Sequence, residues 1–305
     1  MSFSADVKNE LILRSDSAMH CRIAELAGAL SVNGRFVEDE NGTRFLSVRA
    51  DNPALAEKLS RLLYNVMERR FNFEPSYIES KHGFRIIIKD EAVLKELSEK
   101  LKLYKADVYV ESGELVTERT CCKKAYLRGA FLTGGSVSSP EKAYQLEIAA
   151  TTDKNAERLS DIIAALHLDS KRIRRKNRFI VYIKDGDTIS DFLGMTGGMN
   201  SLMEFENIRV LKEMRNSINR TVNCDTANIN KVVNAASKQI DDIKLIEERR
   251  GLESLPEQLR TVAEIRLQNP HLSLAELGER LSPPLGKSGV NHRLAKISKI
   301  ADSMR

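Results

Sequence analysis

Hydrophobic and polar positions follow the same order twice along this chain of 305 residues. Three patterned segments of the first half return in register in the second half. They are LAGALSVNG (26–34) and LRGAFLTGG (127–135), AEKLSRLL (56–63) and AERLSDII (156–163), and FRIIIKD (84–90) and FIVYIKD (179–185). Each copy predicts a helix that ends in glycine, a hairpin, an amphipathic helix, further strand and another helix. Alternate residues of FIVYI face opposite sides of a sheet, so helices can cover one side and leave the other open.

The repeated glycines need a reason, because glycine inside a helix costs roughly 1 kcal/mol relative to alanine. Gly28 and Gly129 predict two paired helices that touch backbone to backbone, since no side chain separates them there. Gly34 and Gly135 fall at the predicted helix ends, where a left-handed C-cap favours glycine.

A turn signal in the first copy separates GRFVE from TRFLSVRA. Asn41-Gly42 is typical of a type I′ hairpin turn. The neighbouring acids Glu38, Asp39 and Glu40 are therefore interpreted as the solvated tip of this hairpin.

The last 55 residues predict a separate helical module. SLPE at 254–257 and SLAE at 273–276 are capping-box signals, and SPPLGK is a turn signal. Ser288 is the expected N-cap of a third helix. Its apolar stripe consists of Val290, Leu294, Ile297 and Ala301.

Three short helices in this arrangement resemble a helix-turn-helix (HTH) module, whose second motif helix enters the major groove of DNA. Residues 287–305 contain five basic residues and one acid, a net charge of +4 in a chain whose total is +5. Asn291 and His292 are suited to base edges, and lysines to phosphates. The alternative is a small bundle with a solvated basic face. The expected DNA contacts of the module are Ser273, Lys287, Ser288, Asn291, His292, Arg293, Lys296 and Lys299.

A second basic segment, KRIRRKNR at 171–178, has six Lys or Arg among eight residues. In an extended segment Arg172, Arg174 and Lys176 share one side, whereas a turn near Lys176-Asn177 places the cluster at a hairpin tip. Such a run is either solvated or in contact with DNA phosphates. The candidate phosphate contacts are Arg172, Arg174, Arg175, Lys176 and Arg178.

The two modules are joined by a segment that reads as amphipathic helix. We therefore predict a repeat domain over 1–205, a helical connector over 206–250 and the HTH domain over 251–305. Asp225 or Thr226 is a candidate cap for a helix that begins within this connector.

The repeat resembles the LAGLIDADG homing-endonuclease fold, with both copies fused in one chain, over roughly residues 20–195. The resemblance implies an α+β fold: a tandem-repeat domain with antiparallel sheets and paired central helices, followed by the all-α HTH domain. It also implies that acids at the sixth and eighth motif letters would hold catalytic metal ions. Here those letters are Ser31 and Leu132, and Asn33 and Gly134.

Hard cations depend on carboxylates, so we expect no catalytic residue and no metal site. Glu25, just before the first motif, is interpreted as a residue of the helix surface. The four cysteines are Cys21, Cys121, Cys122 and Cys224. They contain no CxxC pair, and two adjacent cysteines are poorly placed to share one metal. They are interpreted as reduced core or surface thiols.

The opening MSFSADVKNEL, the segment NRTVNCDTANINK and the run SLAELGERL–SPPLGKSGVNHRLAKI resemble the WhiA family across essentially the whole chain. This resemblance implies a DNA-binding transcriptional regulator. It is linked to sporulation in filamentous actinobacteria and to cell division or chromosome segregation elsewhere. The expected partners are double-stranded DNA and a protein that contacts the LAGLIDADG-like domain, without a cofactor. The alternatives are a metal-dependent endonuclease and a protein-interaction adaptor of cell division.

Two further expectations concern assembly and location. One HTH per chain requires dimerisation only for symmetric half-sites, and the fused repeat already supplies its internal pair, so we expect a monomer in solution. The sequence has neither a run of ~20 apolar residues nor a secretion signal. We therefore expect a cytoplasmic, nucleoid-associated protein without a membrane contact.

Overall fold

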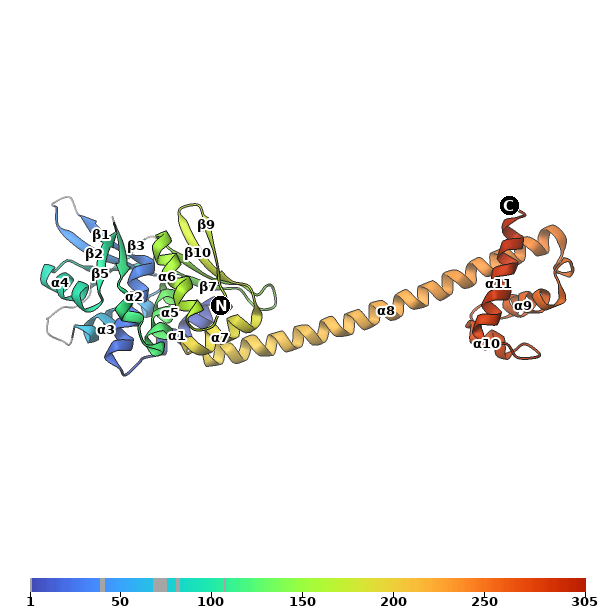
Figure 1. The fold of residues 1–305 in the computed structure, drawn as a ribbon, viewed down its shortest axis with the longest axis horizontal. Helices are drawn as coiled ribbons and strands as arrows, with labels where there is room; N and C mark the ends of the chain where they lie inside the picture. Colours follow the sequence, from blue (N-terminus) through green and yellow to red (C-terminus); the bar gives the residue numbers. More distant parts are fainter. Residues whose placement is uncertain (1, 39–41, 68–75, 81–82, 107) are drawn as a thin grey trace. The chain divides into compact units, whose positions relative to one another are not determined.

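The chain folds into two compact units, Met1–Lys212 and Glu213–Arg305 (Figure 1). The computed structural model describes residues 2–38, 42–67, 76–80, 83–106 and 108–305. Asp39, Glu40 and Asn41 of the predicted first turn lie outside the described residues.

The described part of the first unit combines helices with two antiparallel sheets. Its helices are α1 (Phe3–Leu13), α2 (Met19–Asn33), α3 (Pro53–Val66), α4 (Glu91–Lys100), the 3-10 helix η1 (Glu114–Thr117), α5 (Thr120–Gly134), α6 (Asp153–Ala164), α7 (Gly186–Thr196) and the start of α8 (Met199–Arg250). Its strands are β1 (Gly34–Glu38), β2 (Arg44–Ala50), β3 (Ser76–Ser80), β4 (Gly83–Ile88), β5 (Leu103–Ala106), β6 (Tyr109–Ser112), β7 (Gly135–Val137), β8 (Leu146–Ala150), β9 (Lys171–Arg175) and β10 (Arg178–Ile183).

The strand order repeats as the sequence does. The first sheet has the order β3-β4-β2-β1-β6-β5, and the second has the order β7-β8-β10-β9. The run β3-β4-β2-β1 of the first copy thus returns as β9-β10-β8-β7. The additional strands β5 and β6 follow the first copy in sequence and extend its sheet beside β1. This arrangement confirms the predicted α+β fold with antiparallel sheets.

Local capping explains where the amphipathic helices of both copies begin. The Asn52 side chain accepts a hydrogen bond from the Leu55 backbone N–H at 2.8 Å and starts α3. The Thr152 hydroxyl accepts one from the Asn155 N–H at 3.1 Å and starts α6. Both caps satisfy a backbone donor that the first helical turn leaves unpaired. The apolar faces of these helices then pack into one core with the covered faces of the sheets.

Helices α2 and α5 lie side by side in this core and touch at the repeated glycines. A Cβ atom on Gly28 would lie 2.1 Å from the Tyr126 carbonyl oxygen, and one on Gly129 would lie 1.9 Å from the Glu25 carbonyl oxygen. Both distances are far below van der Waals contact. No residue larger than glycine therefore fits at this crossing.

The prediction of left-handed C-caps at Gly34 and Gly135 was wrong. Both are extended, with φ of −74° and −89°, because the chain passes directly from each helix into β1 or β7. Crowding explains the glycine instead. A Cβ atom would lie 2.5 Å from the Leu30 carbonyl oxygen at Gly34 and 2.3 Å from the Phe131 ring at Gly135.

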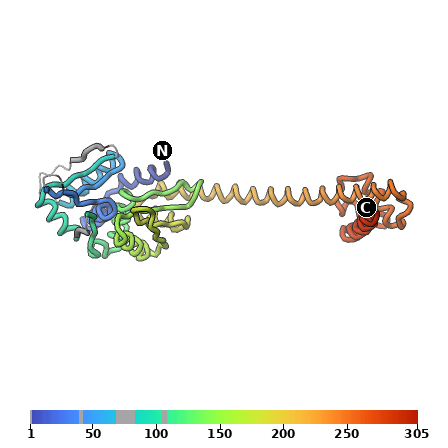
Figure 2. The backbone as a smooth tube through the Cα atoms, turned by 90° about the horizontal axis from the view of Figure 1, so that it is seen from above, coloured from blue at the N-terminus to red at the C-terminus, as the bar shows by residue number. Residues whose placement is uncertain are grey.

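The second unit contains the rest of α8 and a small helical bundle. The bundle elements are the 3-10 helix η2 (Leu252–Ser254), α9 (Glu257–Gln268), α10 (Leu274–Glu279) and α11 (Lys287–Asp302). They surround the C-terminal end of α8, whose Ile243 and Ile246 are fully buried among them (Figure 2). The segment predicted as a connector is continuous α-helix, so Asp225 and Thr226 lie inside α8 and cap nothing.

Two of the predicted helix caps in this unit were wrong. The Ser254 hydroxyl donates to the Gly251 carbonyl at 2.7 Å, and α9 begins after Pro256 without a side-chain cap. Helix α11 begins at Lys287 after Gly286, which places Ser288 in its first turn. The SLAE capping box is confirmed at the start of α10.

Among the described residues, no helix has the length and apolar composition that crossing a bilayer requires.

Candidate nucleic-acid interface

Helix α11 is amphipathic, with a buried apolar stripe on one side and an exposed polar face on the other. Val290, Leu294, Ile297 and Ala301 are buried, as their helical spacing predicts. The opposite face carries most of the predicted DNA contacts in exposed positions. These are Lys287, Ser288, Asn291, His292, Lys296 and Lys299.

The remaining predicted contacts of this module are held by their own unit. Arg293 is half-buried and donates to the Gln258 carbonyl at 3.4 Å. The Ser273 hydroxyl accepts from the Glu276 backbone N–H at 3.3 Å, and the Ser273 N–H donates to the Glu276 carboxylate at 2.7 Å. These hydrogen bonds from Ser273 hold the pKa of Glu276 below its usual value. Arg293 and Ser273 therefore stabilise the helices of the module.

The C-terminal residue, Arg305, also forms ion pairs within its own unit. Arg305 lies 2.6 Å from the fully buried carboxylate of Asp242 and also pairs with Asp302. The hydrogen bond to Asp242 raises the pKa of Arg305. In the described part of the chain, the three exposed lysines of α11 have no acidic partner within 4 Å. The positive charge of the exposed face therefore resides on Lys287, Lys296 and Lys299.

The basic run of the second copy forms a β-hairpin. Strands β9 and β10 pair in antiparallel register, with Arg175 opposite Arg178. Lys176 and Asn177 make the turn, and Lys176 has a left-handed φ of 54°. The predicted turn near Lys176-Asn177 is confirmed, and within the extended strand β9 Arg172 and Arg174 share one side.

The arginines of this hairpin divide between the two faces of the sheet. Arg172 is opposite Val181, a core residue, and lies 3.6 Å from Glu157 of the covering helix α6. Arg174 is opposite Phe179, and its guanidinium lies 5.6 Å from the centre of that ring. Arg175 and Arg178 belong to the opposite, open face.

The first sheet contributes arginines that the sequence analysis did not single out. Arg35 in β1 and Arg49 in β2 alternate with core residues and are exposed on the open face. Arg49 is opposite Arg85 of β4. Alternation in GRFVE and TRFLSVRA is the signal that could have found them. Together they define an open-face basic surface, which consists of Arg35, Arg49, Arg85, Arg175 and Arg178.

Electrostatics show that the two sheets contribute to one positive region. Partial burial and the nearby charges of Arg35 and Arg49 lower the pKa of Arg178. Among the described residues, only two arginines of this surface have an acidic partner. Arg175 lies 3.3 Å from Glu147, and Arg49 lies 3.6 Å from Asp51. Like charges brought together in this way attract a polyanion.

The ends of the paired helices hold no carboxylate at the motif letters. The Ser31 hydroxyl is buried and donates to the Ser112 hydroxyl at 3.1 Å. The Asn33 amide donates to the carbonyls of Arg49 and Thr133 at 3.3 and 3.2 Å. At Gly134 a Cβ atom would lie 2.2 Å from a methyl group of Val32. Packing and hydrogen bonds thus occupy the space in which metal-binding acids would stand.

The interpretation of Glu25 as a surface residue was wrong. Its side chain is fully buried and lies 3.0 Å from Lys58 and 2.9 Å from Arg128. Burial lowers the pKa of Lys58 against the attraction of Glu25. Burial also opposes the charge of Arg128, but hydrogen bonds and charge from Glu25 and Asp16 leave its pKa raised. These groups form a buried ionic network between α2, α3 and α5.

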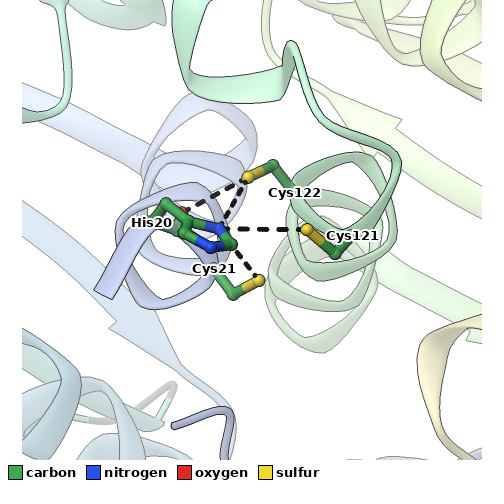
Figure 3. Close-up of side chains that lie close together, drawn as sticks. All are labelled: His20, Cys21, Cys121 and Cys122. Atoms are coloured by element: carbon green, nitrogen blue, oxygen red, sulfur yellow. Dashed lines mark hydrogen bonds between the residues drawn. The ribbon is translucent and has the colours of Figure 1, made fainter. Parts of the chain in front are cut away.

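Three of the cysteines lie together with a histidine at the start of α2 and α5. The Nδ1 atom of His20 lies 3.2 Å from the Cys122 sulfur, 3.3 Å from that of Cys21 and 3.9 Å from that of Cys121 (Figure 3). Burial and the neighbouring sulfurs raise the pKa of Cys21 to about 12, and burial also raises that of Cys122. Adjacent cysteines were expected to be poorly placed to share one metal, yet the sulfurs of Cys121 and Cys122 both lie near His20 on the opposite helix.

Comparisons with known proteins agree with this architecture. The family "WhiA LAGLIDADG-like domain" matches residues 23–115 and 123–215, and "WhiA C-terminal HTH domain" matches residues 218–301. Two proteins named "Probable cell division protein WhiA", from Clostridium beijerinckii and Clostridium tetani, are 42% and 43% identical to this chain. The alignments cover 100% of this chain and 99% and 98% of those proteins.

A solved structure extends the similarity to the fold. The crystal structure of "full-length DUF199/WhiA from Thermatoga maritima" is 28% identical, with a TM-score of 0.58 over 99% of each chain. The repeated LAGLIDADG-like unit, the HTH bundle and full-length relatives above 40% identity lead to one conclusion: the chain belongs to the WhiA family.

Proposed function

We propose that this chain is a non-catalytic DNA-binding protein that acts as a transcriptional regulator. Helix α11 inserts into the major groove, where Asn291 and His292 contact base edges and Lys287, Lys296 and Lys299 contact phosphates. The observation that carries this proposal is the exposed polar face of α11, whose lysines have no acidic partner within 4 Å among the described residues. Ser273 and Arg293 support the module from within.

The LAGLIDADG-like domain serves this function as a scaffold. Its open-face basic surface is suited to the DNA backbone, because guanidinium groups bind phosphate oxygens in a bidentate geometry. Binding of a protein partner by the same domain is the second possibility. The lack of carboxylates at the motif letters and the tight packing at Gly134 favour binding without cleavage.

The biological process is inferred from the relatives. Proteins named for cell division cover this chain completely at 42–43% identity. We infer a role in cell division, with chromosome segregation and, in sporulating relatives, sporulation as related processes. A regulator of this kind works in the cytoplasm in association with the nucleoid.

The proposed state in solution is a monomer, because one chain contains both halves of the central helix pair. A dimer would instead have to pack along the exposed apolar side chains of α8 in the second unit. That stretch exposes a row of apolar side chains, Met214, Ile218, Val222, Ile229, Val232 and Val233. Light scattering across a range of protein concentrations measures the mass directly, and a dimer would overturn the monomer.

The test of DNA binding uses the full chain and a library of genomic fragments at several salt concentrations. Wild-type protein should enrich specific fragments with an affinity that falls steeply with salt. Lys296→Ala/Lys299→Ala should weaken binding and reduce the log–log salt slope by about 0.9 for each lost phosphate contact. Lys238→Ala/Lys244→Ala removes the same charge from exposed positions of α8 and should bind as wild type does.

Two results would replace the proposal. Unchanged affinity in the α11 variant, or no salt slope, favours a protein-interaction adaptor. Plasmid nicking with Mg²⁺ or Mn²⁺ that disappears in Glu38→Gln favours an endonuclease.

A further inference from the structure

Four side chains able to bind a soft metal ion converge at the N-terminal ends of the paired helices. His20 and Cys21 come from α2, and Cys121 and Cys122 from α5. Figure 3 shows the two pairs directed toward one another across the gap between these helices. The pairs occupy equivalent positions of the repeat, because the separation of 101 residues between His20 and Cys121 also relates Gly28 to Gly129.

The distances are those of a nearly formed tetrahedral site. The four ligand atoms lie within 4.8 Å of one another, and the three sulfurs lie 3.2, 3.3 and 3.9 Å from His20 Nδ1. A zinc ion binds sulfur at about 2.3 Å and imidazole nitrogen at about 2.0 Å, so its ligands stand roughly 3.5 to 3.8 Å apart. Side-chain adjustments of up to about 1 Å satisfy this geometry, since the ligand atoms already lie within 4.8 Å of one another.

We propose that His20, Cys21, Cys121 and Cys122 bind one Zn²⁺ ion in a closed Cys₃His site. Three thiolates and one imidazole are a standard structural zinc set and fill all four positions. Soft sulfur ligands also select against Mg²⁺ and Ca²⁺, which prefer oxygen. The site is therefore structural, and it lies apart from the motif letters at the other ends of the same helices.

Binding changes protons but no oxidation state. The three thiols each release one proton to solvent as their sulfurs bind Zn²⁺, and neutral His20 binds through Nδ1 with its proton on Nε2. The ion can enter from the side of Cys121, which is exposed, and His20, which is half-buried. Cys21 and Cys122 are buried. All of these cysteines are free thiols in the structure.

The ion would fasten the two copies of the repeat to each other. The ligand pairs are about a hundred positions apart in the chain, so the site exists only when α2 and α5 are paired. Binding to the folded state alone stabilises it by mass action. The same helices touch at Gly28 and Gly129, and the metal would add a second fixed point about two turns before that contact.

The test measures metal in the full chain expressed with zinc in the medium and dialysed against metal-free buffer. Inductively coupled plasma mass spectrometry should find about one zinc ion per chain. Cys121→Ser changes an exposed ligand and should fold normally but retain at least tenfold less zinc. Cys224→Ser, an exposed cysteine outside the cluster, is the matched control and should retain all of it.

A spectroscopic measurement covers the case in which a variant misfolds. Replacement of zinc by Co²⁺ in the wild-type protein should give the intense visible bands of a tetrahedral site with sulfur-to-cobalt charge transfer. Folded wild-type protein with less than about a tenth of a zinc per chain and a weak, octahedral Co²⁺ spectrum would overturn the proposal. A disulfide between α2 and α5 in protein isolated under non-reducing conditions would also overturn it.

Discussion

The carboxylate of Glu25 and the ammonium group of Lys58 lie 3.0 Å apart, and both side chains are buried. Glu25→Ala would leave Lys58 and Arg128 as buried cations with less compensating charge. We expect a loss of about 3–5 kcal/mol in the free energy of unfolding, measured by denaturant titration. Glu57→Ala breaks the exposed pair with Arg61 and should cost less than about 1 kcal/mol. Equal losses in the two variants would contradict a buried network.

The glycine contact predicts a severe packing defect. Gly129→Ala places a methyl group 1.9 Å from the Glu25 carbonyl oxygen, so the two helices must separate. We expect a destabilisation of about 1–3 kcal/mol or more, with a lower Tm. Gly194→Ala within α7 is the control, because its Cβ would meet only Leu202 at 3.4 Å. It should be neutral or slightly stabilising, and a similar loss there would argue against the close contact as the cause.

Base-reading and phosphate-binding residues should respond differently in binding assays. Asn291→Ala should change which fragments are enriched and cost about 1–3 kcal/mol at its preferred site. Arg178→Ala should weaken binding to all fragments evenly and lower the salt slope by about 0.9. Lys95→Ala, on the helix that packs against the covered side of the first sheet, is the charge-matched control. Loss of sequence preference in Arg178→Ala would contradict this division of roles.

The capping box of α10 predicts a pH dependence. Hydrogen bonds from Ser273 lower the pKa of Glu276 below 4.5, so the folded state holds the carboxyl proton less tightly than the unfolded state does. Its contribution to stability is therefore present above pH 4.5 and is lost as the pH falls through the folded-state pKa. After division by the intrinsic exchange rate, the protection of the α10 amides against hydrogen exchange should fall more steeply on acidification in wild type than in Glu276→Gln. Glu279→Gln on the same helix is the control, and parallel curves for wild type and Glu276→Gln would refute the linkage.

The sequence predicts those features that depend on local pattern and on repetition. The duplicated unit, the hairpin turn at Lys176-Asn177, the buried stripe of α11 and the SLAE cap all follow from periodicity or turn chemistry within a few residues. The helix starts at Glu257 and Lys287 were missed because serines upstream or inside the first turn mimic caps that the chain does not use.

Features that depend on distant partners could not be predicted in this way. Glu25 reads as a surface residue because its cations, Lys58 and Arg128, are 33 and 103 positions away. The thiol cluster is hidden for the same reason, since neither His20-Cys21 nor Cys121-Cys122 has metal-site spacing alone. Arg35 and Arg49 join Arg178 only through the relative placement of two sheets.

The contact at Gly28 and Gly129 also constrains evolution. Each glycine faces a main-chain oxygen of the opposite copy, and no substitution can shorten a main chain. A side chain gained in one copy therefore cannot be compensated by a smaller side chain in the other. The two copies differ at their sixth and eighth motif letters, but at this crossing both must keep glycine.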